Sequence, residues 1–385
     1  MKKITAFILA LILFLSACNA AFASVAKNPL KLDAKAAVLV DTKSGKILYS
    51  YNARQKRSPA SVTKVMSLIL VAEAIESGKI SLKDVVVASK NAAALDGTEI
   101  YLKTGEKMTV NDLIKATVMA SANDACTALA EHVAGSRRAF VKMMNAKAKQ
   151  LGMKNTHFQN CTGLDVGISN HYTTALDIVK MSAELMKHKL MVRYTTTWID
   201  KIRGGKTTLV NTNKLLRTYK GCIGLKTGMT TKAGYCLSSV VQKGNTRFCG
   251  VILGSKSAKN RFKSMTRMLN YGYRHFQTAK YEVDLSQAGN IGVNHGEKKF
   301  VELLVNQKSL YITVPRGKGG EVDTIVRLDK ELEAPVRKNQ VVGTVRFSLG
   351  SKELKKVNIL AKEEIKEKSF ENVFRNLFKS LVTNS

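Results

Sequence analysis

The apolar positions near the start of the chain change from a strand pattern to a helix pattern. Two short apolar runs, at 37–41 and 46–50, flank the segment Thr42-Lys43-Ser44-Gly45. Such runs around a polar, glycine-containing segment are typical of a β-hairpin. From Ser61 to Glu76 the apolar residues instead recur at helical spacing, and Gly78 follows as a C-terminal cap. The pattern therefore predicts a hairpin followed by a helix.

Helical periodicity continues through the middle of the chain, and strand-like runs return after it. The predicted helices cover 111–133, 138–150 and 174–187. The helix over 111–133 can be broken in its middle, and it stops at Gly135. The predicted strands cover 223–226, 235–241 and 248–253. Strands at both ends of a helical middle predict an α/β (α+β) fold, with one antiparallel sheet built from distant segments and an inserted helical lobe.

The pattern changes again beyond Phe276. Short strand-like runs recur with turn residues between them, which predicts a small all-β domain over 276–360. The last segment, 361–385, predicts an amphipathic helix that lies on a membrane surface. Packing of its apolar stripe on the β domain is the alternative. The stripe consists of Phe370, Val373, Phe374, Leu377, Phe378 and Leu381.

Charge narrows the choice of partners. The 62 Lys and Arg residues against 29 Asp and Glu give a formal net charge of +33. This balance favours nucleic acid, anionic lipid or acidic wall polymers as surroundings. No apolar run reaches the roughly 18 residues that a membrane-spanning helix needs, which excludes a polytopic membrane protein.

The N-terminus favours the cell envelope among these surroundings. Met1-Lys2-Lys3 precedes an apolar stretch over 4–17, and Ala21-Phe22-Ala23 offers a small-residue cleavage site. These features predict a secretory signal peptide over 1–23, hence a location at the outer face of the cytoplasmic membrane and no nucleic-acid partner. The segment Leu15-Ser16-Ala17-Cys18 resembles a lipobox, so lipidation at Cys18 is the alternative to simple cleavage.

The remaining five cysteines form no C-x-x-C pair and are expected to be buried thiols. A bridge between Cys222 and Cys236 across a hairpin is the alternative. The six histidines show no ligand spacing, so we expect no metal site and no cofactor.

Three motifs carry candidate chemistry, in the order Ser61-Val62-Thr63-Lys64, Ser121-Ala122-Asn123 and Lys226-Thr227-Gly228. S-x-x-K, S-D-N and K-T-G are the motif set of serine β-lactamases and penicillin-binding proteins. A second S-x-x-K, at Ser24, has no helix signal after it. The order of the motifs, and the structural element on which each one lies, favour a catalytic site.

Each motif suits one part of an acyl transfer. Residues i and i+3 share a helix face, so the Lys64 amine is expected to reach the Ser61 hydroxyl. Lys64 can deprotonate Ser61 if the pKa of Lys64 is lowered. Burial near a second cation, Lys226, would lower that pKa. The Ser61 backbone N–H is an oxyanion donor. Ser121 can relay a proton to the leaving amine, and Asn123 can hold a substrate amide.

The third motif suits substrate recognition. Lys226 and Thr227 are expected to bind a substrate carboxylate. Gly228 lets a peptide-like substrate pair with the strand edge.

Beyond the motifs, Tyr49–Ala53, Phe158–Asp165 and Ala233-Gly234-Tyr235 resemble D-alanyl-D-alanine carboxypeptidases, the low-molecular-mass penicillin-binding proteins of peptidase family S11. The resemblance covers essentially the whole mature chain. It implies a β-lactamase/DD-peptidase-like domain over 30–275. It also implies peptidoglycan pentapeptide stems as substrates and β-lactams as covalent inhibitors.

The resemblance also implies roles for individual residues. Ser61 would be the acylated nucleophile and Lys64 the general base. The backbone N–H of Met229 would be a second oxyanion donor. Two residues depart from the family pattern: Ala122 replaces a common glycine or aspartate, and Met229 stands where relatives often carry His.

Two rival functions are compatible with the same motifs. A serine β-lactamase needs a base that activates water, and no Glu-x-x-x-Asn segment of the class A type lies between the second and third motifs. A catalytically silent wall-binding protein has no need for an intact Ser61 and Lys64. A serine-type D-Ala-D-Ala carboxypeptidase is therefore the predicted function.

Overall fold

A five-stranded antiparallel sheet organises the N-terminal domain in the computed structural model, which describes residues 28–286, 288–307 and 309–369. The strand order is β2-β1-β9-β8-β7, so β1 pairs with β9 more than 200 residues later in the chain. The strands are β1 (Ala36–Asp41), β2 (Ile47–Tyr51), β7 (Cys222–Thr230), β8 (Gly234–Lys243) and β9 (Thr246–Ser255). The predicted hairpin and the predicted sheet of distant segments are confirmed.

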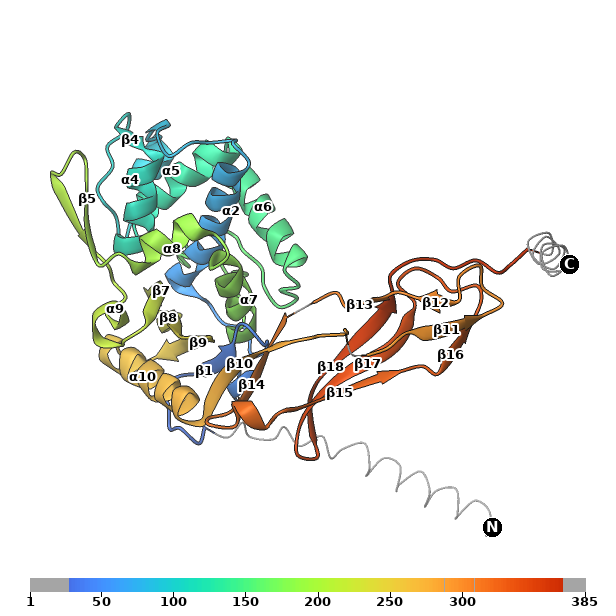
Figure 1. The fold of residues 1–385 in the computed structure, drawn as a ribbon. Coiled ribbons are helices and arrows are strands. Elements are labelled where there is room, and N and C mark those ends of the chain that lie inside the picture. The colour runs from blue at the N-terminus through green and yellow to red at the C-terminus, as the bar shows by residue number, and fades with distance from the viewer. Residues whose placement is uncertain (1–27, 287, 308, 370–385) are drawn as a thin grey trace, which may run out of the picture.

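Both faces of this sheet are covered by helices (Figure 1). Along β1, Val38 and Val40 pack towards the helical lobe, while Ala37 and Leu39 pack towards α10 (Ala258–His275). Because successive strand residues face opposite sides, an all-apolar strand is what a sheet covered on both faces requires.

The helical lobe lies between β2 and β7 in the sequence. Its longer elements are η1 (Ala60–Thr63), α2 (Lys64–Glu76), α4 (Val110–Lys115), η2 (Ala116–Ala120), α5 (Asn123–Ala134), α6 (Arg137–Gln150), α7 (Ala175–Leu185) and α8 (Lys189–Thr196). The shorter ones are β3 (Val85–Val87), α3 (Lys90–Ala93), β4 (Lys107–Thr109), β5 (Ile199–Ile202), β6 (Thr207–Val210) and α9 (Leu215–Thr218). The helix predicted over 111–133 is indeed broken, by the π-helical turn η2 and by Ser121 in the left-handed conformation.

The sequence pattern did not predict α10. Its apolar residues Met265, Met268 and Leu269 pack on the sheet, and basic residues surround them in the sequence. These apolar residues recur at helical spacing, so the signal for the helix was present in the sequence but was overlooked among the basic residues.

The C-terminal domain consists of short β-sheets, as predicted. Its elements are β10 (Phe276–Glu282), β11 (Ile291–Asn294), β12 (Phe300–Val301), β13 (Leu303–Leu304), β14 (Ser309–Pro315), η3 (Gly319–Glu321), β15 (Asp323–Leu328), β16 (Glu331–Glu333), β17 (Val341–Leu349) and β18 (Lys352–Ala361). A separate core that includes Val345, Phe347 and Ile359 fills the space between the sheets.

The helix predicted to begin at Ala361 does not begin there. β18 ends at Ala361, Ile365 then pairs with Val336, and the Lys368 N–H donates to the carbonyl of His295. The β domain thus continues past 360, because these backbone groups complete its sheets. The apolar stripe from Phe370 onward, the signal peptide, Cys18 and Ser24 lie outside the described residues.

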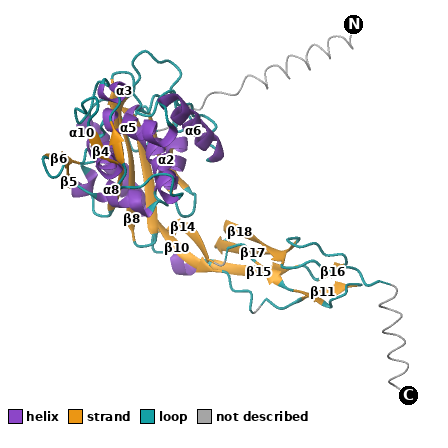
Figure 2. Ribbon diagram, turned by 90° about the horizontal axis from the view of Figure 1, so that it is seen from above, coloured by secondary structure: helices purple, strands orange, loops and turns teal. Residues whose placement is uncertain are grey.

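The two domains meet where α10 runs directly into β10, and the C-terminal domain extends away from this junction (Figure 2). The fully buried Asp41 of β1 accepts hydrogen bonds from the hydroxyls of Thr278 (2.7 Å) and Thr313 (2.5 Å). A buried carboxylate needs such donors. The junction is therefore a specific polar contact.

The cysteines of the described residues are all free thiols, four of them buried as expected. Cys222 pairs with Val241 across the β7–β8 ladder while Cys236 pairs with Gly228, so the alternative Cys222–Cys236 bridge is wrong. Among the described helices, none combines the length and apolarity needed to cross a bilayer.

Candidate active site

The three predicted motifs meet where β7 passes the start of the helical segment η1–α2. Gly228 is in closest contact: a Cβ added there would lie 2.9 Å from both the Pro59 carbonyl oxygen and the Ser61 backbone nitrogen. Real Cβ atoms do not approach so closely, so only glycine lets the strand and the nucleophile's backbone meet. The substrate-pairing role of Gly228 stays a prediction, and this contact inside the protein is a second requirement for glycine that sequence reasoning missed.

Lys64 is the centre of the site. Its ammonium nitrogen Nζ lies 3.1 Å from Ser61 Oγ, 2.6 Å from Asn123 Oδ1 and 3.0 Å from the Thr162 carbonyl oxygen. The predicted i, i+3 contact is confirmed, although Ser61 itself lies in the 3-10 turn η1 before α2. Three acceptors match the three N–H bonds of an ammonium group. When the amine is neutral, Asn123 and Thr162 can keep two N–H bonds and leave the lone pair for Ser61.

The electrostatics of the two lysines follow from their burial. Lys64 is fully buried, and the loss of solvation lowers its pKa to about 8. Burial also lowers the pKa of Lys226, and repulsion from Lys64 and Arg261 lowers it further. The neutral amine that a base needs is thus accessible near neutral pH.

The second motif depends on the helix break. Ser121 has a φ of 67° and separates η2 from α5, so that Asn123 starts the new helix beside Lys64. Asn123 Nδ2 donates to the Asp96 carbonyl (2.8 Å) and its backbone N–H to the Thr98 carbonyl (2.7 Å). The amide is therefore held in one orientation with its oxygen on Lys64, a role that sequence reasoning missed.

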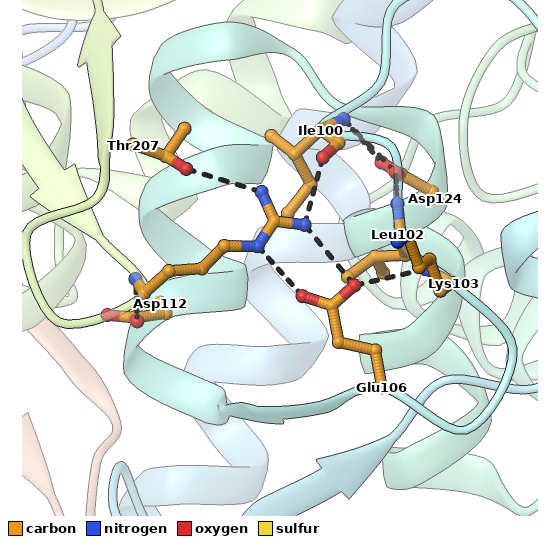
Figure 3. Close-up of polar contacts among 8 residues, drawn as sticks. Ile100, Leu102, Lys103, Glu106, Asp112, Asp124 and Thr207 are labelled. Atoms are coloured by element: carbon orange, nitrogen blue, oxygen red, sulfur yellow. Dashed lines mark hydrogen bonds and ion pairs between the residues drawn. The ribbon is translucent and has the colours of Figure 1, made fainter.

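A polar network fixes the loop that precedes β4 (Figure 3). The buried carboxylate of Asp124 accepts the backbone N–H groups of Ile100 and Leu102. Arg203, from the turn between β5 and β6, donates to the Ile100 carbonyl (2.9 Å) and to Glu106 Oε1 (2.8 Å). The loop over 99–106 is thus held from both sides, beside a groove lined by Tyr101, Ala120, Arg203 and Val210.

The segment Phe158–Asp165 contributes through its backbone and its last residue. Beyond the Thr162 carbonyl, Gly163 packs so closely on Ala60 that a Cβ there would lie 1.9 Å from the Ala60 carbonyl oxygen. Asp165 Oδ2 accepts hydrogen bonds from Ser58 (3.2 Å) and Thr230 (2.6 Å). This carboxylate therefore ties the flanks of the first and third motifs together.

His171 supports the same loop. Its Nδ1 accepts the Gln159 N–H (3.1 Å), so in the neutral ring Nε2 carries the proton and donates to Thr63 Oγ1 (2.9 Å). Burial lowers the pKa of His171 to about 4, which keeps the ring neutral.

The third motif lies on β7, an edge strand. Lys226 is buried and donates only weakly, at 3.2 Å, to the Thr227 carbonyl, and Thr227 Oγ1 donates to Thr212 Oγ1 (2.8 Å). Met229, which follows the motif, is 55% exposed.

Behind the strand, Arg261 of α10 donates from Nη1 to the carbonyls of Gly228 (3.0 Å) and Cys236 (3.1 Å). Sequence reasoning missed Arg261 because it missed the helix that carries it.

A partly exposed serine hydrogen-bonded to a buried lysine at a helix start, and faced by the edge strand of an antiparallel sheet, defines the class of serine acyl-transfer enzymes to which penicillin-binding proteins belong. Residues 23–257 match the family model described as D-alanyl-D-alanine carboxypeptidase. Residues 276–367 match the model of the penicillin-binding protein 5 C-terminal domain.

Individual relatives cover nearly the whole chain. D-alanyl-D-alanine carboxypeptidase DacF of Bacillus subtilis is 36% identical over 96% of both chains. The crystal structure of penicillin-binding protein 5 from Haemophilus influenzae, 31% identical, superposes with a TM-score of 0.80 and covers 89% of this chain and 100% of its own. Penicillin-binding protein D2 from Listeria monocytogenes, solved in its ampicillin-bound form, is 32% identical, with a TM-score of 0.59 over 63% of this chain and 99% of its own.

The chain belongs to the D-alanyl-D-alanine carboxypeptidase family, and it is a serine-type penicillin-binding protein of that family. The predicted function and the α/β catalytic domain with a β-rich C-terminal domain are confirmed.

Proposed function

We propose that the protein removes the terminal D-alanine from peptidoglycan pentapeptide stems through an acyl-enzyme on Ser61. The observation that carries this proposal is the buried Lys64 amine, 3.1 Å from Ser61 Oγ, with a pKa lowered to about 8. In the first step the neutral Lys64 takes the Ser61 proton while Oγ attacks the carbonyl carbon between the two D-alanines. The resulting oxyanion accepts hydrogen bonds from the backbone N–H groups of Ser61 and Met229.

Collapse of this intermediate breaks the peptide bond. The proton held by Lys64 passes to the leaving amine, with the Ser121 hydroxyl as relay, and D-alanine departs. Water then attacks the ester carbonyl, its OH stays on the acyl carbon, and one of its protons passes to Ser61 Oγ, so that the shortened peptide leaves with a free carboxyl group and the enzyme is regenerated. Asn123 and the Thr162 carbonyl keep the Lys64 amine aimed at Oγ through both steps.

The third motif selects a free carboxylate. Lys226 lies buried with a lowered pKa, and an arriving carboxylate favours its charged form. The Thr227 hydroxyl can turn from Thr212 to the same carboxylate. The bicyclic carboxylate of a β-lactam meets the same groups, which supports β-lactams as covalent inhibitors, as does the ampicillin-bound relative.

The proposed setting is the outer face of the cytoplasmic membrane. Residues 1–23 would be removed as a signal peptide, or Cys18 lipidated, and the segment from Phe370 would bind the membrane surface through its apolar stripe. We divide the remainder into a catalytic domain over 30–275 and a β domain that starts at 276. The net charge of +33 supports an anionic envelope surface as the surroundings.

Two substitutions and two substrates test the reaction. Ser61→Ala is expected to abolish labelling by fluorescent penicillin and D-alanine release while the protein stays folded, and Ser24→Ala, the matched control in the other S-x-x-K, to change neither. Labelling of a folded Ser61→Ala variant would exclude the assignment.

A pentapeptide with an amidated terminus should react about 10- to 150-fold more slowly than the free acid, because it loses a charge-assisted hydrogen bond. Rapid nitrocefin turnover would instead favour a β-lactamase.

A further inference from the structure

A cluster of ionisable side chains lies at the end of α2 opposite Ser61, where α7 and α8 pack on that helix. Glu73 and Glu76 lie in the last turn of α2, Glu184 lies near the end of α7, and His188 precedes α8. Glu73, Glu184 and His188 each place a ligand atom within 4.8 Å of those of the other two. Along the helix axis Glu73 is about 14 Å from Lys64, so the cluster is separate from the active site.

His188 is the unusual member of this cluster. The residue is only 7% exposed, and its Nδ1 lies 2.9 Å from both carboxylate oxygens of Glu76. Its Nε2 is buried and has no hydrogen-bond partner among the described residues. An ionised carboxylate accepts hydrogen bonds and donates none, so the nitrogen that faces Glu76 must be the donor. In a neutral ring Nδ1 therefore carries the proton, and the lone pair lies on Nε2. A buried acceptor without a donor is costly, and it points to a ligand that is electron-poor.

We propose that Glu73, Glu184 and Nε2 of His188 form a binding site for a divalent transition-metal cation of the zinc type. Imidazole is a ligand that zinc accepts and that magnesium and calcium avoid. Two carboxylates and one imidazole supply three ligands, and water can complete a tetrahedron. Glu76 supplies the carboxylate that metal-binding histidines usually have on their other ring nitrogen.

The neighbouring charges are compatible with a cation. Lys147 contacts Oε1 of Glu73, and Lys187 contacts Oε2 of Glu184 at 2.6 Å. Each lysine uses one oxygen of its carboxylate, so the other oxygen of each is available to the metal. Lys187 is 71% exposed and can swing into solvent without loss of packing. The carboxylates of Glu73, Glu76 and Glu184 with these two lysines leave one formal negative charge, and once Lys187 has moved into solvent two remain, which match the charge of the dication.

A metal here would join the end of α2 to the α7–α8 connection. Helix α2 carries Lys64 at its other end, so the expected effect is on the stability of the lobe and not on the chemistry. The competing arrangement is an imidazolium held by carboxylates with no metal, and the experiment separates the two.

The test uses the full chain without an affinity tag, treated with EDTA and dialysed. Titration with zinc chloride is followed by calorimetry, and cobalt(II) binding by visible absorption. We expect one zinc per chain, a higher Tm with zinc, and cobalt d–d bands without the thiolate charge-transfer band that a cysteine site would give. Zinc binding should be lost in His188→Ala and in Glu184→Gln. Glu76→Ala should bind the same number of ions about 10- to 100-fold more weakly.

His275→Ala is the control, since His275 is exposed on α10 and should not affect zinc binding. Penicillin labelling should persist in every variant. If His188→Ala fails to fold, Glu184→Gln decides the question. The proposal is wrong if the wild-type chain binds no zinc at micromolar concentration, if binding survives in folded His188→Ala or Glu184→Gln, or if cobalt shows thiolate charge transfer.

Discussion

The pH dependence of acylation tests whether Lys64 is the base that activates Ser61. Only the neutral amine can accept the Ser61 proton, so the rate must rise as pH rises through the pKa of Lys64. Burial places that pKa at about 8. The neutral fraction then grows from about one tenth at pH 7 to about nine tenths at pH 9. We therefore expect the acylation rate constant to rise about tenfold over this range and then to level off.

An ordinary lysine pKa would give a different profile. With a pKa near 10.4, the rate would rise about 100-fold between pH 7 and pH 9 and show no plateau there. The assay is stopped-flow acylation by a saturating fluorescent penicillin, because the bound carboxylate keeps Lys226 charged.

Substitution of Lys64 provides the control for this profile. Lys64→Arg keeps the positive charge but cannot lose its proton, and acylation should fall by about 10²- to 10⁴-fold at every pH. A flat profile in the wild type, or a Lys64→Arg variant that reacts within tenfold of wild type, would refute this role for Lys64.

Three further substitutions test the contacts that build the site and the junction. Gly228→Ala forces β7 away from Ser61 and should lower Tm and slow acylation, at a cost of about 1–3 kcal/mol, while Gly292→Ala, where a Cβ meets open space, should change neither. The neutral ring of His171 contributes stability that is complete above its unfolded pKa of about 6.5 and is lost as pH falls towards 4, so up to about 3 kcal/mol should disappear over that range. A His171→Gln variant should show a shallower decline of Tm in the same acid range, and an identical decline would contradict this account. Asp41→Ala removes the acceptor of two interdomain hydroxyls, so calorimetry should resolve separate transitions for the two domains, and a single unshifted transition would show that the junction does not depend on this carboxylate.

Local pattern predicted most elements of the catalytic domain because each is recorded in neighbouring residues. The hairpin, the buried helix after Ser61 and the strands of the third motif all have their own period. The same reasoning failed at two places, for different reasons. Helix α10 repeats its apolar residues at helical spacing, but the many basic residues between them hid that pattern. The tail from Ala361 to Ser369 pairs with loops of the β domain that lie distant in the sequence.

The chemical identity of the site was also readable from the chain alone. A serine and a lysine one helical turn apart, followed in order by two further motifs, determined which residues meet and which reaction class they serve. That spacing depends only on helix geometry, which is the same in every protein.

Only the tertiary structure decided how these residues are tuned. Lys64 receives its acceptors from Asn123 and Thr162, which are 59 and 98 positions away, and its lowered pKa comes from burial by the whole lobe. The need for glycine at 228 likewise arises from the backbone of Pro59 and Ser61. Side-chain spacing is a local property of the chain, whereas desolvation and close approach depend on which distant segments exclude water from the same place.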